Sequence, residues 1–266
     1  MARALIGTSG WMYDHWAGRF YPNGLAKAKW LAHYAERFDT VELNNPFYRQ
    51  PSRETFERWR DAVPERFVYT VKLNRFITHL KRLAIEPESV ERSYGTMAGL
   101  GTKLGVVLVQ LPPRMRFDAA RLERFMRLVS RRRRRHAIEP RDGSWFAEEA
   151  LALLRRRGIA LCVQDSAKWP TRPEVVTAPF VYLRFHGPER LYASGYSDAQ
   201  LAAWAERIRG WLGRGLDVYA YFNNDVPDHA PRDAMRLRAM LGEDVAPLPG
   251  RPARATFTPR PWRPGG

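Results

Sequence analysis

Short apolar runs alternate with helix-like stretches along most of the chain. Each run finishes on a polar or charged residue, and the stretches between the runs carry apolar residues three or four positions apart, as amphipathic helices do. Because parallel neighbouring strands need a crossover between them, this alternation predicts a parallel sheet covered by helices. The expected strands are Ala4–Ser9, Thr40–Asn44, Phe67–Lys72, Val106–Gln110, Ala137–Arg141, Ala160–Asp165, Phe180–His186 and Val218–Asn224.

Such a series of strand–helix units can close on itself, so we expect an α/β fold of the TIM-type (β/α)8 barrel class. The 266 residues suit one domain, since such barrels take roughly 250 residues, and we place the barrel at 1–242. An open doubly wound sheet is the alternative, but it explains the polar residue at the end of nearly every strand less readily. Residues 243–266 are rich in Pro, Arg and Gly, so we expect a loosely held tail.

Start and stop signals place the helices between these strands. Ser52 and Ser144 are expected to cap helix N-termini, because a serine hydroxyl accepts a free backbone N–H of the first turn. Gly158 is expected to end the helix that starts at Ser144, since glycine adopts the left-handed conformation at low cost. The expected helices cover 26–38, 52–59, 88–100, 118–129, 144–157, 198–212 and a last stretch that ends at 241.

The charge of the chain bears on its partners. A net charge of +16 and a pI near 10.5 favour nucleic acid, phosphorylated molecules or anionic membranes. The excess is mostly arginine, which a GC-rich genome also produces, so both explanations stay open. The run Arg131–Arg135 indicates a nucleic-acid patch when it is read alone. It precedes the fifth strand, however, so we favour a solvated helix end that stabilises the helix dipole.

The remaining composition indicates a cytoplasmic protein. Cys162 is the only cysteine and lies in an apolar run, so we expect it to be buried and no disulfide to form within the chain. No run reaches the ~18 apolar residues of a membrane helix, and Met1–Gly10 carries no cleavage-type segment. We therefore expect no membrane partner, and the pattern does not indicate an oligomeric state.

Polar and aromatic residues crowd the segments that follow the expected strands. In a barrel the loops after the strands carry the chemistry, and they meet at the carboxyl ends of the strands, which we call the mouth. Burying so many polar groups costs free energy unless they bond each other or a ligand. The expected mouth residues are Trp11, His15, Trp16, Glu42, Asn44, Tyr48, Lys72, Arg75, His79, Gln110, Glu139, Arg141, Asp165, Arg184, His186, Asn223, Asn224 and Asp225.

The candidates for catalysis are Glu42, Lys72, Glu139, Asp165 and His186. Glu42 and Glu139 are suited to general acid and base catalysis, or each pairs with an arginine and orders loops; both alternatives stay open. Lys72 is suited to a Schiff base with a carbonyl or to a fixed cation. The fixed cation is favoured, because several arginines lie at the same end. His186 directly ends a strand and is a better candidate than His79.

Arginines at the mouth predict an anionic ligand, because a guanidinium fork binds two oxygens at once. The Asn223–Asp225 segment precedes the last helix, where barrels often hold phosphate. Aromatic rings there either stack a base or sugar, at about 1–3 kcal/mol for each nucleic-acid base, or cap the barrel as packing, and packing is favoured for at least half. The binding candidates are Trp11, Trp16, Asn44, Tyr48, Arg75, His79, Arg141, Trp145, Arg184, Asn223, Asn224 and Asp225, with Tyr21 among the aromatics.

A divalent metal is an open alternative at the mouth. Suitable ligand types are Glu42, Glu139, Asp165, His186 and Asp225. No spacing of the His-x-x-x-His kind and no paired cysteines fix a site. A hydrogen-bond network is therefore favoured over a metal.

Several long motifs stand in order along the chain. They are Gly7-Thr8-Ser9-Gly10-Trp11-Met12-Tyr13, Thr40-Val41-Glu42-Leu43-Asn44, Arg75-Phe76-Ile77-Thr78-His79, Gln110-Leu111-Pro112-Pro113, Glu139…Arg141…Ser144-Trp145, Tyr182-Leu183-Arg184-Phe185-His186-Gly187 and Tyr221-Phe222-Asn223-Asn224-Asp225. Over about residues 5–241 this order resembles the DUF72 (YecE-like) family. The resemblance implies a TIM-type barrel and a family without a settled activity.

Two positions depart from the family pattern that the resemblance implies. Pro46 stands where the family usually has Thr, and Asp142 stands where it often has His. If that histidine were an essential acid or base, this member would be altered or inactive. A barrel that has lost catalysis and serves as an interaction partner is therefore a third alternative.

We expect an enzyme that binds an anionic, phosphate-bearing or nucleotide-like substrate at the mouth, with carboxylate and histidine groups that move protons. A hydrolase or lyase that acts on such a substrate fits this chemistry. The alternative is a nucleic-acid-binding protein without chemistry that uses its basic surface. Its signature is an affinity that falls steeply with salt.

Overall fold

Parallel strands form the centre of the protein in the computed structural model, which describes residues 2–130, 134–166, 168–169 and 171–242. The expected tail at 243–266 and Arg131–Arg133 lie outside the described residues. The strands are β1 (Ala4–Thr8), β2 (Thr40–Leu43), β3 (Val68–Lys72), β4 (Leu104–Gln110), β5 (Arg135–Glu139), β6 (Ala160–Leu161), β7 (Val163–Asp165), β8 (Phe180–Phe185) and β9 (Asp217–Phe222).

The strands pair in two parallel sheets of orders β1-β9-β8-β7 and β2-β3-β4-β5-β6. The sheets approach each other at two places. Ser9, just after β1, forms an isolated parallel bridge with Glu42 of β2, and Cys162 alone separates β6 from β7. The expected strand Ala160–Asp165 is therefore two strands, because its first half pairs with β5 and its second half with β8. The result is an α/β fold with parallel sheets.

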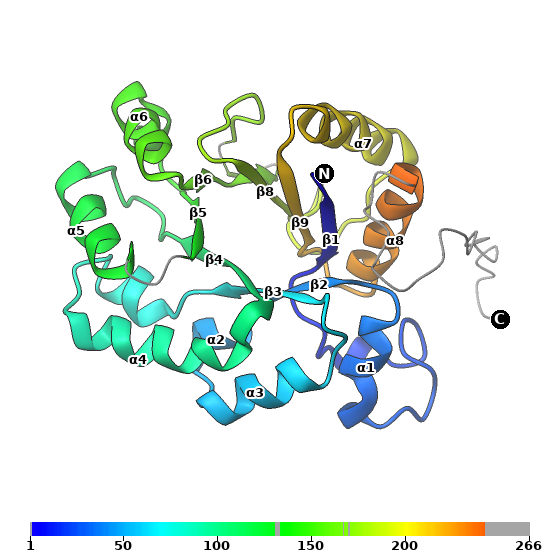
Figure 1. Ribbon diagram of the computed structural model, residues 1–266. Helices are drawn as coiled ribbons and strands as arrows, with labels where there is room; N and C mark the ends of the chain where they lie inside the picture. The colour runs from blue at the N-terminus through cyan, green and yellow to red at the C-terminus, as the bar shows by residue number, and fades with distance from the viewer. Residues whose placement is uncertain (1, 131–133, 167, 170, 243–266) are drawn as a thin grey trace.

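Helices lie around the outside of the strands, as Figure 1 shows. They follow the strands in the alternation that the apolar pattern predicts, except that the described residues between β7 and β8 contain no helix. The α-helices are α1 (Trp30–Ala35), α2 (Asn45–Tyr48), α3 (Arg53–Asp61), α4 (Pro87–Met97), α5 (Ala119–Ser130), α6 (Glu148–Arg157), α7 (Asp198–Gly213) and α8 (His229–Leu241). Shorter turns are the 3₁₀ segments η1 (Asp14–Trp16), η2 (Lys27–Lys29), η4 (Ala98–Lys103) and η5 (Gly143–Phe146) and the π-helical turn η3 (Phe76–Leu80).

Of three expected helix caps, two are confirmed and one is wrong. Ser52 caps α3, since its Oγ accepts the backbone N–H of Thr55 at 3.3 Å. Ser144 caps no α-helix: Asp142 accepts the N–H of Ser144 at 3.0 Å and caps η5, and α6 begins later, at Glu148. The Ser144 hydroxyl instead accepts the backbone N–H of Phe117 at 2.8 Å and donates to Oδ1 of Asp142 at 2.6 Å, so it is engaged away from α6. Gly158 ends α6 with φ 62°, as expected.

The buried apolar side chains form two groups with different surroundings. The larger packs the strands against the helices, and the smaller consists almost entirely of strand residues. The members of the smaller group are Leu5, Val68, Val106, Leu108, Ala137, Ala160, Cys162, Phe180, Tyr182, Tyr219 and Tyr221. Side chains on a strand alternate between its two faces, so the residue two positions further along points the same way. Polar side chains take over from this group toward the carboxyl ends of the strands.

Close packing between β1 and β2 explains one glycine. A Cβ on Gly7 would lie 2.2 Å from the backbone oxygen of Thr40, and no real Cβ makes such a contact. The Oη of Tyr34, in α1, donates to the same Thr40 oxygen at 3.0 Å and accepts from the backbone N–H of Thr8 at 3.0 Å. The seam between β1 and β2 therefore depends on a residue without a side chain.

Two expectations from composition also meet the structure. Cys162 is buried, and burial raises the pKa of its thiol well above the ordinary value. Within residues 2–130, 134–166, 168–169 and 171–242, no helix is both long enough and apolar enough to cross a membrane.

Candidate functional site

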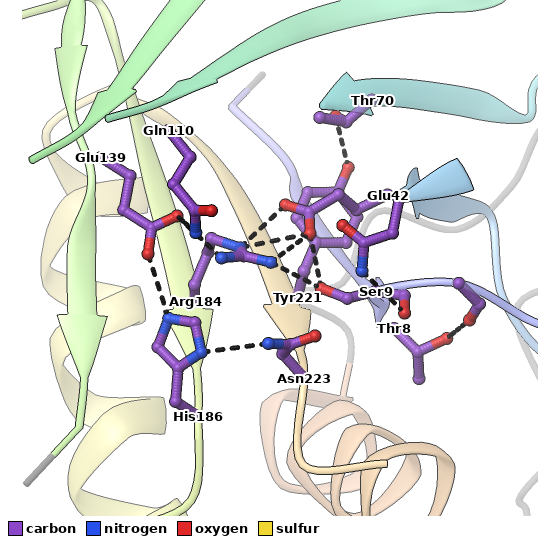
Figure 2. Close-up of polar contacts among 12 residues, drawn as sticks. Thr8, Ser9, Glu42, Thr70, Gln110, Glu139, Arg184, His186, Tyr221 and Asn223 are labelled. Atoms are coloured by element: carbon purple, nitrogen blue, oxygen red, sulfur yellow. Dashed lines mark hydrogen bonds and ion pairs between the residues drawn. The ribbon is translucent and has the colours of Figure 1, made fainter. Parts of the chain in front are cut away.

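A buried ion-pair network connects the carboxyl ends of strands from both sheets, as Figure 2 shows. Arg184 of β8 lies between Glu42 of β2 and Glu139 of β5, and all three side chains are buried. Its Nη2 lies 2.7 Å from Oε1 of Glu42, its Nε 3.1 Å from Oε2 of Glu42, and its Nη1 2.7 Å from Oε2 of Glu139. Each nitrogen of this guanidinium therefore donates to a carboxylate.

Further donors complete the coordination of both carboxylates. Glu42 accepts from Oγ of Ser9 at 2.6 Å and from Oη of Tyr182 at 2.5 Å. Glu139 accepts from Nε2 of Gln110 at 2.9 Å and from Nη2 of Arg141 at 2.8 Å. Burial alone would raise the pKa of Glu139, but the charges of Arg184 and Arg141 and the contact with His186 hold it well below the ordinary value. Glu139 is therefore a carboxylate near neutral pH.

His186, just after β8, is fully buried beside Glu139. Its Nε2 lies 3.3 Å from Oε1 of Glu139, although the two groups are not aligned for a full hydrogen bond. The amide Nδ2 of Asn223 lies 3.1 Å from Nδ1. An amide nitrogen only donates, so Nδ1 accepts and Nε2 carries the ring proton. Burial lowers the pKa of His186, so the ring is neutral near pH 7.

Lys72 and His79 both contact the Phe47 ring. Nζ of Lys72 lies 4.0 Å from the ring centre, and the ring of His79 meets Phe47 edge to face at 5.0 Å. Burial, together with the charges of Arg184 and Arg141, lowers the pKa of Lys72 to about 8. Burial, together with the charges of Lys72 and Arg141, lowers the pKa of His79 to about 4. Both shifts indicate positive potential at this part of the mouth.

Arg141 extends this positive region toward the loop after β7. Its guanidinium lies 4.0 Å from the ring centre of Trp169. Among the described residues, no hydrogen-bond partner meets the buried Nε of Arg141, Nε1 of Trp169 or Oδ1 of Asn44. Arg75 is exposed and forms no ion pair with any residue that the structure describes. Buried polar atoms without partners are costly in a folded protein, so these atoms are candidates to contact a ligand.

Two expected site residues point away from this network. Oδ2 of Asp165 accepts from Nε1 of Trp204 in α7 at 2.6 Å, and Nδ2 of Asn224 donates to Oδ2 of Asp233 in α8 at 3.0 Å. The placement of both at the mouth is therefore wrong. The residue before each of them, Gln164 or Asn223, has a side chain that faces the network or lies beside it. Successive side chains along an extended chain point to opposite faces.

Most of the aromatic candidates pack rather than face a ligand. Trp11, Trp16, Tyr21 and Trp145 are buried. The indole of Trp16 donates to the backbone oxygen of Asp225 at 3.0 Å, with His15 Nε2 2.9 Å from the same oxygen, and that of Trp145 donates to Met115 at 2.8 Å. Tyr48 differs, since 66% of its surface is exposed. Packing is thus observed for most of the set, as favoured.

Four residues of the site were not singled out from the sequence. Ser9 and Tyr182 bind Glu42, Gln164 is buried with its Nε2 2.9 Å from the backbone oxygen of Pro140, and Trp169 stacks on Arg141. The period-two alternation holds a signal for three of them. Counting by two reaches Ser9 from Leu5, Gln164 from Cys162 and Tyr182 from Phe180. Trp169 lies in a loop, where no such count applies.

The metal alternative has no geometric support. In the part of the chain that the structure describes, no three His, Cys, Asp or Glu side chains are placed to hold a metal ion. Glu42 and Glu139 direct their oxygens at Arg184 instead. The favoured hydrogen-bond network is what the structure contains.

The amino ends of the strands carry a different kind of charge. Arg135 pairs with Asp217 at 2.7 Å, and Arg155 pairs with Glu148 at 2.7 Å. A surface hollow of about 360 Å³ also lies at this end, lined in part by Glu36 and Arg66. Asp39, buried just before β2, lies 3.7 Å from Arg66 and 3.1 Å from Arg238, and both arginines are partly exposed.

The sequence matches the family described as "Protein of unknown function DUF72" over residues 5–256. The chain belongs to the DUF72 family. It is similar to the UPF0759 protein YunF of Bacillus subtilis, with 26% identity over 91% of this chain and 96% of that protein. A DUF72 family crystal structure from Thermotoga maritima has 29% identity and a TM-score of 0.78, covering 90% of this chain and 99% of that chain.

More distant structures share the fold alone. A DUF72 family protein from Enterococcus faecalis has a TM-score of 0.77 at 22% identity, covering 90% of this chain and 95% of that chain. A D-psicose 3-epimerase crystallised with D-fructose has a TM-score of 0.54 at 11% identity, covering 91% of this chain and 100% of that chain. These likenesses agree with the α/β architecture.

Proposed function

We propose that this protein is an enzyme that binds an anionic, phosphate-bearing or nucleotide-like substrate at the mouth, where a histidine–carboxylate pair moves protons. We also infer that the two sheets are the halves of one (β/α)8 barrel, since Ser9 bridges to Glu42 at one seam and Cys162 continues the chain across the other. The carrying observation is the excess of buried positive charge. Two carboxylates, Glu42 and Glu139, face three cations.

The third of these cations has no carboxylate of its own. Arg184 bonds both carboxylates and Arg141 bonds Glu139, which leaves Lys72 without an ion pair among the described residues. The pKa values of Lys72 and His79, about 8 and about 4, are lowered first by burial and then by neighbouring cations. A bound anion relieves this repulsion, so the mouth favours negative ligands.

Glu42 and Glu139 differ in what they can do. Glu42 is enclosed by Ser9, Tyr182 and Arg184, which suits an anchor for the guanidinium. Glu139 lies beside His186, whose Nδ1 is the ring nitrogen that can take up a second proton. We assign proton transfer to the Glu139–His186 pair, because the carboxylate stabilises the imidazolium that forms. Arg141 is the binding group, with its unpartnered Nε.

Ligand binding is tested first, by thermal denaturation with inorganic phosphate, sugar phosphates and nucleotides. We expect at least one of these anions to raise Tm, and the variant Arg141→Gln to lose that increase. The matched control is Arg155→Gln, which changes an arginine at the amino ends of the strands and should keep the increase. Absence of stabilisation by every anion tested would contradict the anion site.

Catalysis is tested on the substrate that binds. We expect Glu139→Gln and His186→Gln to lower kcat at least about a hundredfold, since general acid–base catalysis contributes 10²–10⁴-fold. Glu139→Gln and His186→Gln proteins that turn over this substrate at the parent rate would remove the acid–base assignment.

Nucleic-acid binding is a second candidate, on a surface other than the one expected. The structure exposes Tyr48 and Phe76, by 66% and 43%, beside Arg49 and Arg75. Bases stack on exposed aromatic rings, and unpaired arginines hold phosphates. Titration of labelled RNA and DNA at two salt concentrations tests this candidate. Affinity that falls with salt and is lost in Arg75→Ala, but kept in Arg135→Ala, supports it.

A further inference from the structure

Lys72 ends β3 with an amine that has no polar partner. The residue is only 7% exposed, and its Nζ forms no hydrogen bond or ion pair with any residue in the described ranges. The ring of Phe47, 4.0 Å away, holds the amine in place. A buried ammonium group is normally paired or hydrogen-bonded, so this lysine is unusual for its position.

The surroundings of Lys72 lower its pKa to about 8, so a minor fraction of the amine is neutral near pH 7. Burial penalises the ammonium, and the charges of Arg184 and Arg141 add to that penalty, whereas Glu139 and Glu42 oppose it. The two carboxylates direct their oxygens at guanidinium groups rather than at the lysine. An amine on a buried side chain next to fixed cations is the usual state of a nucleophilic lysine.

We propose that Lys72 is a nucleophile that forms a Schiff base with an aldehyde or ketone carbonyl of the phosphate-bearing substrate. This inference rests on the proposed function, because the anion site is what would bring the carbonyl to the amine. It assigns the substrate to a chemical class, the phosphorylated carbonyl compounds. The fixed-cation role that the sequence favours for Lys72 is replaced.

The chemistry balances without an oxidant or a reductant. The lone pair of neutral Nζ attacks the carbonyl carbon and forms the C–N bond, and the carbonyl oxygen takes up a proton. The C–O bond then breaks, and the oxygen leaves as water with the two hydrogens that the amine gives up. The Glu139–His186 pair of the same network is suited to move these protons.

Pyridoxal 5′-phosphate, which carries both an aldehyde and a phosphate, is the probe. The full chain is incubated with it, reduced with borohydride and digested, and the labelled lysines are identified by mass spectrometry. The chain has six lysines, at 27, 29, 72, 81, 103 and 168. We expect Lys72 to react at least about tenfold faster than exposed Lys81 at pH 8. The labelling rate should rise to half its maximum near pH 8, the pKa of Lys72.

Two variants provide the matched comparison. Lys72→Gln should lose the fast label, and Lys81→Gln should keep it. The labelled lysines are mapped on the protein with its parent sequence, so the result does not depend on whether the Lys72→Gln variant folds. A label spread evenly over the lysines, or concentrated on the exposed ones, overturns the proposal.

Competition separates this proposal from the proposed function. Inorganic phosphate should protect Lys72 from the probe and raise Tm. Protection and a raised Tm without selective labelling would refute the Schiff base and leave the anion site standing. Selective labelling that phosphate does not slow, without any rise in Tm, would support the nucleophile and refute the anion site.

Discussion

The two ends of the strands each bury one lysine, and the two lysines differ in their partners. At the amino ends, Lys103 is 6% exposed, and its Nζ donates to the backbone oxygens of Arg60 at 2.7 Å and Val63 at 2.9 Å. At the carboxyl ends, Lys72 is 7% exposed, and no residue that the structure describes accepts a hydrogen bond from it. Burial is the same, so burial does not distinguish a structural lysine from a functional one. The number of Nζ hydrogens that are donated to an acceptor does distinguish the two lysines.

The arginines repeat the contrast. Arg135, near the amino ends, pairs with Asp217 and with Oη of Tyr219 at a partly exposed position. Arg184 bonds two carboxylates from the other sheet in a fully buried position. An exposed ion pair contributes little to stability. Removing one member of a buried ion pair strongly destabilises the protein, because the other charge stays buried without its partner. The mouth therefore carries a stored electrostatic cost that the Arg135–Asp217 pair lacks.

Removing one arginine from each end should give the largest difference. Arg184→Met leaves Glu42 and Glu139 buried without their shared cation, so we expect a loss of about 3–5 kcal/mol in the free energy of unfolding. Arg135→Met should cost less than about 1 kcal/mol. Urea denaturation followed by circular dichroism measures both. Equal losses in the two variants would show that the two ends are energetically alike.

The two buried lysines should respond to the same substitution with opposite signs. Lys72→Met removes a cation that burial disfavours, and the pKa shift from 10.5 to about 8 corresponds to a gain of about 3 kcal/mol at pH 7. Lys103→Met leaves two backbone oxygens without their donor, so we expect a loss of about 1–3 kcal/mol. Both values come from chemical denaturation at pH 7.

The pH dependence sharpens this prediction. The pKa of Lys72 in the folded state is about 8, below the 10.5 of an ordinary lysine, so the unfolded chain binds more protons between these two pH values. The stability of the parent protein therefore rises across that window, and the advantage of Lys72→Met should vanish by about pH 10.5. An advantage that is constant from pH 7 to 10.5 would rule out this explanation.

Two histidines provide the smallest and most local comparison. The pKa of His79 at the mouth and that of His136, buried at the other end beside Oη of Tyr94 at 2.8 Å, are both lowered to about 4. Burial alone lowers the pKa of His136, whereas cations contribute for His79. Inorganic phosphate should therefore raise the pKa of His79 by about one unit and leave His136 unchanged. NMR titration of the two rings, with and without phosphate, measures this.

The apolar pattern contained the strands and their order, because burial on both faces leaves continuous runs of Val, Ile, Leu and aromatic residues. It also predicted that Glu42, Glu139 and Arg184 lie close together at the carboxyl ends of the strands, since parallel strands align these ends. The apolar pattern did not predict the bridge that Arg184 makes between the two carboxylates, because that bridge depends on distances between strands of different sheets.

Other errors have local causes. Asp165 and Asn224 were assigned to the mouth by their place at strand ends, without regard to which face each side chain takes. Ser144 does not cap α6, because its hydroxyl bonds Phe117 and Asp142 instead. Trp169 follows β7 in a segment without periodicity, and its contact with Arg141 is set by the path of that loop alone.

The pairing of β1 with β9 has a consequence for synthesis of the chain. Ala4 is in register with Val218, and Thr8 with Phe222. A ribosome that adds about 5–20 residues per second exposes Val218 roughly 10–40 s after Ala4. Throughout that interval the first strand emerges without the neighbour that hydrogen-bonds to it. We therefore expect the nascent protein to depend on chaperones until β9 has been synthesised.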